Sequence, residues 1–148
     1  MWHQFLTALL LSSLTVLIHS LGSYAVFVWV TGYLKRHPQP SLVQGWWVLT
    51  RFVVDLLLLH AIEVAVWAQF YVFMHGFSDV GTAYYYSLSS YTTVGYGDVV
   101  LARPWRFLGA WEAMLGVLMF GWSTATLAAL LHHFHEIRLR HLNAPVST

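Results

Sequence analysis

Apolar residues are arranged along the chain in three long stretches that are separated by short polar segments. The stretches cover about residues 5–34, 46–74 and 104–135. A helix rises about 1.5 Å per residue and the hydrocarbon layer of a membrane is about 30 Å thick, so about 20 apolar residues are enough to cross it. Each stretch is longer than that. The pattern therefore predicts three membrane-spanning helices.

A fourth segment, residues 82–91, lies between the second and third stretches and has a different character. It is rich in tyrosine and serine, and a loop with two glycines follows it. It is too short to span a membrane and too polar to face lipid, so we expect a re-entrant half-helix that is buried in protein. The predicted fold is an all-α membrane protein with three transmembrane helices, a re-entrant helix and a loop.

Composition agrees with a membrane location and excludes several other classes. The chain is 58% hydrophobic and only 9% charged, whereas soluble domains carry about 25% charged residues. There is no cysteine, so a disulfide framework and a thiolate metal site are excluded. The chain has no run of basic residues that would predict a nucleic-acid partner.

Basic residues predict the orientation of the helices in the membrane. They gather between the first two stretches and at the end of the third: Lys35, Arg36, Arg51, Arg138 and Arg140. Because cytoplasmic segments are enriched in Lys and Arg, both places should be cytoplasmic and the N-terminus outside, although Arg103 and Arg106 are exceptions to this bias. We expect a multi-pass protein of the plasma (cell inner) membrane with a cytoplasmic C-terminus.

The loop after the half-helix has the sequence TTVGYGD at residues 92–98. Glycines at alternate positions let every second residue adopt a positive φ at little steric cost. Successive carbonyl oxygens then lie along one line, where they can replace the hydration shell of a potassium ion. This stretch resembles the pore module of the potassium-channel family, and the match from Thr93 to Asp98 is letter for letter. The resemblance extends over about residues 46–135.

The resemblance implies a potassium-selective channel that conducts passively, with no enzymatic activity. Potassium ions would be held by the carbonyls of Thr93, Val94, Gly95 and Tyr96 and by the Thr93 hydroxyl, while Gly97 and Asp98 would support the filter. One filter loop per chain implies a homotetramer in the lipid bilayer. Four residues before Thr93, where some members carry an acid, this chain has Ser89.

The same resemblance divides the chain into three parts. Residues 1–45 form an additional transmembrane helix with a cytoplasmic loop, residues 46–136 form the pore domain, and residues 137–148 form a short cytoplasmic tail. The additional helix lacks a row of arginines at every third position, so it is not expected to sense voltage. We expect it to pack against the helix that follows it.

Several residues of the third stretch are candidates for the gate. Gly116 resembles a hinge glycine, but a packing role explains it equally well. Phe120 and His132 lie on one helical stripe with Thr124 and Ala128, which we expect to face the pore axis. Protonation of four His132 side chains would favour a wider pore; an ordinary interfacial histidine is the alternative.

Ionisable residues inside the apolar stretches are further candidates. Glu63 and Glu112 are expected about 16 Å and about 12 Å deep. Such carboxylates must pair, protonate or face water, so they could share a proton or bind hydroxyls behind the filter. His19 and His60 are also expected near mid-membrane, as structural or functional groups.

Two alternatives to a conducting channel stay open. His19 and His60 could be axial ligands of a haem in a membrane electron-transfer protein. The chain could also be a non-conducting accessory subunit of other channels.

Overall fold

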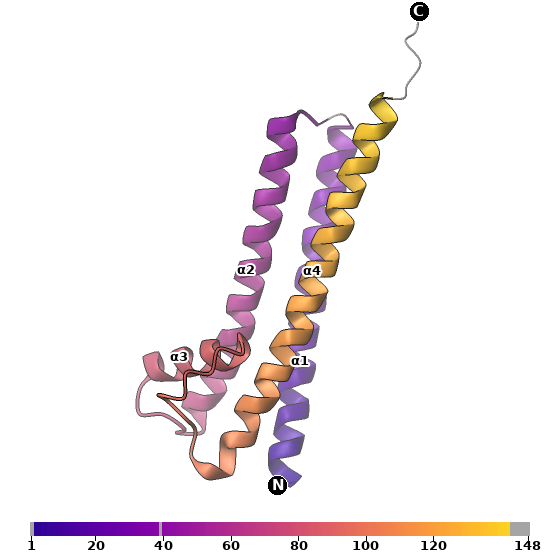
Figure 1. Ribbon diagram of the computed structural model, residues 1–148. Coiled ribbons are helices and arrows are strands. Elements are labelled where there is room, and N and C mark those ends of the chain that lie inside the picture. The colour runs from indigo at the N-terminus through magenta and orange to yellow at the C-terminus, as the bar shows by residue number, and fades with distance from the viewer. Residues whose placement is uncertain (1, 39, 143–148) are drawn as a thin grey trace, which may run out of the picture.

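The computed structural model describes residues 2–38 and 40–142, and it is all-α over this part of the chain. Three long helices lie side by side, and one short helix lies across their end (Figure 1). The elements are α1 (Trp2–Arg36), α2 (Leu42–Phe73), α3 (Val80–Tyr91), the 3₁₀ helix η1 (Arg103–Trp105) and α4 (Arg106–Leu142). The predicted fold class is confirmed at this level.

Helix α2 begins at Leu42, earlier than the apolar pattern indicated, because a capping box precedes it. The backbone N–H of Gln44 donates to Ser41 Oγ at 3.3 Å, and the Ser41 N–H donates to Gln44 Oε1 at 2.9 Å. This reciprocal pair satisfies two backbone donors at the start of the helix. Residues 42–45, which precede the second apolar stretch, are therefore part of a helix and not of a loop.

Asp79 caps the short helix α3. The Thr82 hydroxyl donates to Asp79 Oδ2 at 2.6 Å and the Thr82 N–H donates to Oδ1 at 2.8 Å. These bonds favour the ionised carboxylate, so they hold the pKa of Asp79 below its usual value, the hydroxyl having the larger effect. The cap fixes where α3 starts, and hence where its other end meets α4.

Two segments, Trp2–Arg36 and Arg103–Ile137, are long and apolar enough to cross a membrane by length and composition. Helix α2 is similar in length and carries Arg51, Asp55 and Glu63. The polar loop before α3, the loop after it and the start of α1 lie at one end of the bundle. The α1–α2 connection and the end of α4 lie at the other (Figure 1).

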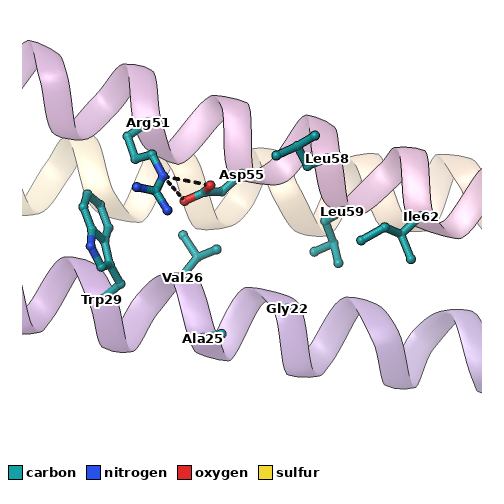
Figure 2. Close-up of a pocket in the computed structure, with 9 residues that line it drawn as sticks. All are labelled: Gly22, Ala25, Val26, Trp29, Arg51, Asp55, Leu58, Leu59 and Ile62. Carbon is teal, nitrogen blue, oxygen red and sulfur yellow. Dashed lines mark hydrogen bonds and ion pairs between the residues drawn. The ribbon is translucent and has the colours of Figure 1, made fainter.

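Helix α1 packs against α2, as expected, and also against α4. At Gly22 the first two helices approach so closely that an added Cβ would lie 2.4 Å from Leu59 Cδ1; Figure 2 shows these two residues on facing helices. Nearby, Arg51 Nε lies 2.9 Å from both carboxylate oxygens of Asp55, and its guanidinium lies 4.9 Å from the centre of the Trp29 ring. The opposite charges of Arg51 and Asp55 are therefore paired within α2.

Two apolar clusters hold the bundle together. One joins α1, α2, α3 and α4 at the end where α3 lies, and the other joins α1, α2 and α4 toward the opposite end. In the first, Tyr71, Tyr91 and Leu108 have no exposed surface. Close packing and van der Waals contact drive helix association in a membrane, so this cluster fixes the short helix against its neighbours.

Candidate functional site

The loop after α3 has an unusual backbone. Three residues at alternate positions have positive φ: Thr93 (63°), Gly95 (51°) and Gly97 (77°). Hydrogen bonds from Thr93 N–H to the Ser90 carbonyl (2.9 Å) and from Gly95 N–H to the Ser89 carbonyl (3.1 Å) tie the loop to the last turn of α3. A left-handed conformation costs a residue with a Cβ roughly 1–2 kcal/mol. Such strain at Thr93 is typical of functional sites.

This alternation matters for the direction of the carbonyl groups. In an extended strand successive carbonyls point to opposite sides, whereas left-handed residues at every second position can turn them to one side. The loop is also exposed in the single chain, with Val94 51% and Tyr96 74% accessible. The residues expected to hold potassium thus lie together on an uncovered edge of the molecule.

Asp98, expected to support the loop, is held by a residue of α3. The Tyr85 hydroxyl donates to Asp98 Oδ2 at 2.8 Å. This bond connects the loop's far end back to the middle of the short helix. The sequence did not identify Tyr85 as the partner of Asp98.

Glu112 lies behind α3 and joins three helices. Its carboxylate is 2.5 Å from Ser87 Oγ on α3 and accepts a hydrogen bond of 2.7 Å from the Tyr71 hydroxyl on α2. All three side chains are fully buried. The structure therefore gives Glu112 hydroxyl partners, one of the arrangements that the sequence allowed.

Glu63 is the centre of a second buried group. His19 Nδ1 lies 2.7 Å from Glu63 Oε1, His60 Nδ1 lies 3.2 Å from Oε2, and the Tyr91 hydroxyl donates to Oε2. On its other side, His60 Nε2 lies 3.0 Å from Ser123 Oγ. The group therefore connects α1, α2, α4 and the last residue of α3. We refer to His19, His60, Glu63 and Tyr91 as the Glu63 cluster.

The arrangement of the two histidines does not favour the haem alternative. Their ring centres are 5.4 Å apart, and both Nδ1 atoms face the same carboxylate. Axial ligands of a haem lie on opposite faces of the macrocycle with the iron between them. Here the Glu63 carboxylate takes the place that an iron would need.

The gate candidates on α4 lie in different surroundings. Gly116 is buried, and a Cβ added to it would lie 2.0 Å from the Tyr91 carbonyl oxygen. In this conformation Gly116 lets the end of α3 pack on α4, so the structure favours the packing interpretation. The Phe120 ring is half-buried and contacts His60 and Tyr91, with ring centres 4.7 and 5.4 Å apart.

The rest of the predicted stripe is uncovered in the single chain. Thr124, Ala128 and His132 are all exposed. His132 Nε2 lies 3.3 Å from Glu136 Oε1, one turn further along α4. The stripe thus divides into a packed part at Phe120 and an exposed part nearer the C-terminal end of α4.

Sequence reasoning missed three partners: Tyr71, Ser87 and Ser123. Each is a hydroxyl-bearing residue in an apolar or aromatic segment. A buried carboxylate needs hydrogen-bond donors, so the presence of Glu63 and Glu112 was the available signal. The pattern did not say which hydroxyl faces which acid.

A family model described as an ion channel matches residues 59–133, half of the chain. The chain belongs to this ion channel family. The matched range contains the second half of α2, all of α3, the loop and most of α4. No curated protein and no solved structure matches the chain. Ion transport across a membrane is therefore the function that the family supports, and α1 lies outside the matched range.

Proposed function

We propose that the chain is the subunit of a potassium-selective channel that conducts passively through the loop 93–97. The proposal rests on one observation, the positive φ at Thr93, Gly95 and Gly97 within an ion channel family member. Carbonyls turned to one side can replace the water around a dehydrated potassium ion. The carbonyls of Thr93, Val94, Gly95 and Tyr96, with the Thr93 hydroxyl, are the proposed ligands.

A single loop cannot surround an ion, so the proposal includes a homotetramer. Four copies of the loop close a ring, and the edge that is exposed in one chain becomes the inner wall. The exposed part of α4, with Thr124 and Ala128, then lines the cavity on the cytoplasmic side of this ring. Three membrane-spanning helices per subunit, with the loop outside and the C-terminus in the cytoplasm, complete the proposed arrangement in the plasma membrane.

Cation flux from liposomes that contain the purified chain tests the proposal. We expect potassium flux that barium blocks, with little sodium flux. In Gly95→Ala nothing lies within 4 Å of the new Cβ, but the backbone at φ 51° becomes strained. At about 1–2 kcal/mol per copy, selective flux should fall at least roughly tenfold.

Gly45→Ala is the control for this experiment, because it adds the same methyl group in α2 with nothing within 4 Å. It should conduct like the unmodified chain. Equal fluxes of sodium and potassium would contradict the proposed selectivity. Absence of any flux would favour the accessory-subunit alternative, in which the chain needs a different partner to conduct.

The Tyr85–Asp98 bond leads to a second prediction. Tyr85→Phe removes the hydroxyl that holds Asp98 and should lower the ratio of potassium to sodium flux by about two- to fivefold. Thermal unfolding should hardly change, since Tyr85 is 40% exposed. Tyr84→Phe is the matched control: Tyr84 is its neighbour on α3 and is 39% exposed. If both variants change selectivity equally, the bond to Asp98 is not the cause.

A further inference from the structure

We propose that His19 of α1 is a positioning residue for the filter, acting through Glu63 on Tyr91. The idea rests on the proposed potassium-channel function and gives a role to the helix that the family match does not include. His19 touches no ion and no filter residue. It holds the carboxylate that in turn holds the end of α3.

The path from α1 to the filter is short and fully buried. His19 and Glu63 have no exposed surface, and their closest atoms are 2.7 Å apart. Glu63 Oε2 accepts the hydrogen bond from the Tyr91 hydroxyl, and Tyr91 is the last residue of α3, two positions before Thr93. Two hydrogen bonds therefore connect α1 to the last residue of α3, directly before the loop.

Tyr91 is held both by its side-chain hydroxyl and by its backbone carbonyl. Its hydroxyl is bound in the Glu63 cluster, and its carbonyl packs against Gly116 of α4. The backbone just beyond it depends on this placement, because Thr93 N–H donates to Ser90 O at 2.9 Å and Thr93 has φ 63°. A strained residue persists only when its surroundings fix it. Loosening the Tyr91 ring therefore loosens the support of Thr93.

The charge of Glu63 explains why His19 matters. Among the described residues, the side chains that bind this carboxylate are those of His19, His60 and Tyr91. None of them is a lysine or an arginine. An ionised carboxylate in a low-dielectric interior needs its donors. Without His19, Glu63 Oε1 loses the contact that holds it at 2.7 Å. The carboxylate is then free to turn away from the Tyr91 hydroxyl, which donates to its other oxygen.

The distances favour hydrogen bonding in this group over metal binding. The ligand atoms of His19, His60 and Glu63 all lie within 4.8 Å of one another, and these residue types can bind zinc. Two ligands of one tetrahedral zinc, each about 2.0–2.1 Å from the metal, stand roughly 3.3 Å apart. The His19–Glu63 distance of 2.7 Å is shorter, and it is the distance of a charge-assisted hydrogen bond.

Helix α1 also makes contacts that do not lead to α3, and these provide a control. Trp67 Nε1 donates to Thr15 Oγ1 at 3.0 Å, and both residues are fully buried. Thr15 lies one turn before His19 on the same face of α1. A variant at Thr15 weakens the α1–α2 contact without removing a partner of Glu63.

The test compares three variants of the full chain in liposomes and in detergent. His19→Phe keeps a ring and removes the donor; His19→Asn keeps an N–H near the place of Nδ1; Thr15→Val removes the acceptor of Trp67. Selectivity is measured as potassium against sodium flux. Support of the filter is measured separately, as hydrogen exchange of the amides at residues 92–95.

We expect exchange at residues 92–95 to become about tenfold faster in His19→Phe, the effect of losing one hydrogen bond to a charged group, and selectivity to fall. His19→Asn should restore both readouts, and Thr15→Val should leave both unchanged. The proposal is overturned if His19→Phe and Thr15→Val behave alike, or if the unmodified chain holds zinc that His19→Phe loses. Should the unmodified chain conduct no potassium, the proposed function fails, while the exchange rates still decide the role of His19.

Discussion

Replacing Gly116 with alanine is expected to destabilise the folded chain and to abolish selective conduction. The new Cβ would lie 2.0 Å from the Tyr91 carbonyl oxygen and 2.9 Å from its carbonyl carbon. Overpacking of this kind costs about 1–3 kcal/mol, and alanine returns at most about 1 kcal/mol in helix propensity. Since the obstacle is backbone, the end of α3 must move, and the filter moves with it. Unfolding in detergent and liposome flux measure the two effects.

Alanine variants at two other glycines, Gly109 and Gly45, provide a comparison for the loss of stability at Gly116. In Gly109→Ala the new Cβ would lie 2.0 Å from the Tyr86 hydroxyl oxygen, the far end of a side chain that can rotate away. Gly45→Ala meets nothing within 4 Å. We expect the loss of stability to rise from Gly45 through Gly109 to Gly116. A Gly116→Ala variant that is stable and conducts would contradict the packing interpretation of this glycine.

Replacing Glu112 with leucine is expected to have the second large effect. Leucine is similar in size, but it leaves the buried Tyr71 hydroxyl without its acceptor, and Ser87 keeps only the Val64 carbonyl, 2.9 Å away. An unsatisfied buried hydroxyl costs about 1–3 kcal/mol and the loss of one hydrogen bond about 1 kcal/mol. The variant should therefore lower the free energy of unfolding by about 2–4 kcal/mol. Denaturant unfolding of the purified chain measures the change.

Glu112→Gln is the matched comparison, because its side-chain carbonyl still accepts a hydrogen bond from one hydroxyl. It should be destabilised by less than half as much as Glu112→Leu. If leucine is tolerated as well as glutamine, the carboxylate does not hold α3 to α2 and α4. Its burial would then need another explanation.

Much of the helical framework could be predicted from hydrophobicity alone. Three long apolar stretches and one short polar segment became α1, α2, α4 and α3. The ends were less certain, because the caps at Ser41 and Asp79 start α2 and α3 a few residues before the predicted segments. The alternating glycines indicated positive φ at Gly95 and Gly97, while the positive φ at Thr93 required the structure.

The partners of the buried acids could not be predicted in the same way. In a soluble helix the polar face marks the surface, so the period of the sequence shows which side faces inward. In an apolar helix the residues that face lipid and those that face protein are alike, and this signal is lost. The sequence therefore predicts how deep Glu63 and Glu112 lie but not the direction in which they point.

The sequence by itself determined the element types, their order and the filter-like loop, because these depend on hydrophobicity, capping and glycine at particular positions. Only the tertiary structure decided that α1 contacts α4 as well as α2, that His19 binds Glu63, and that Tyr91 lies between Glu63 and Gly116. These contacts depend on how each helix is rotated about its own axis. That rotation is set by close packing at positions such as Gly22 and Gly116, which only the assembled bundle reveals.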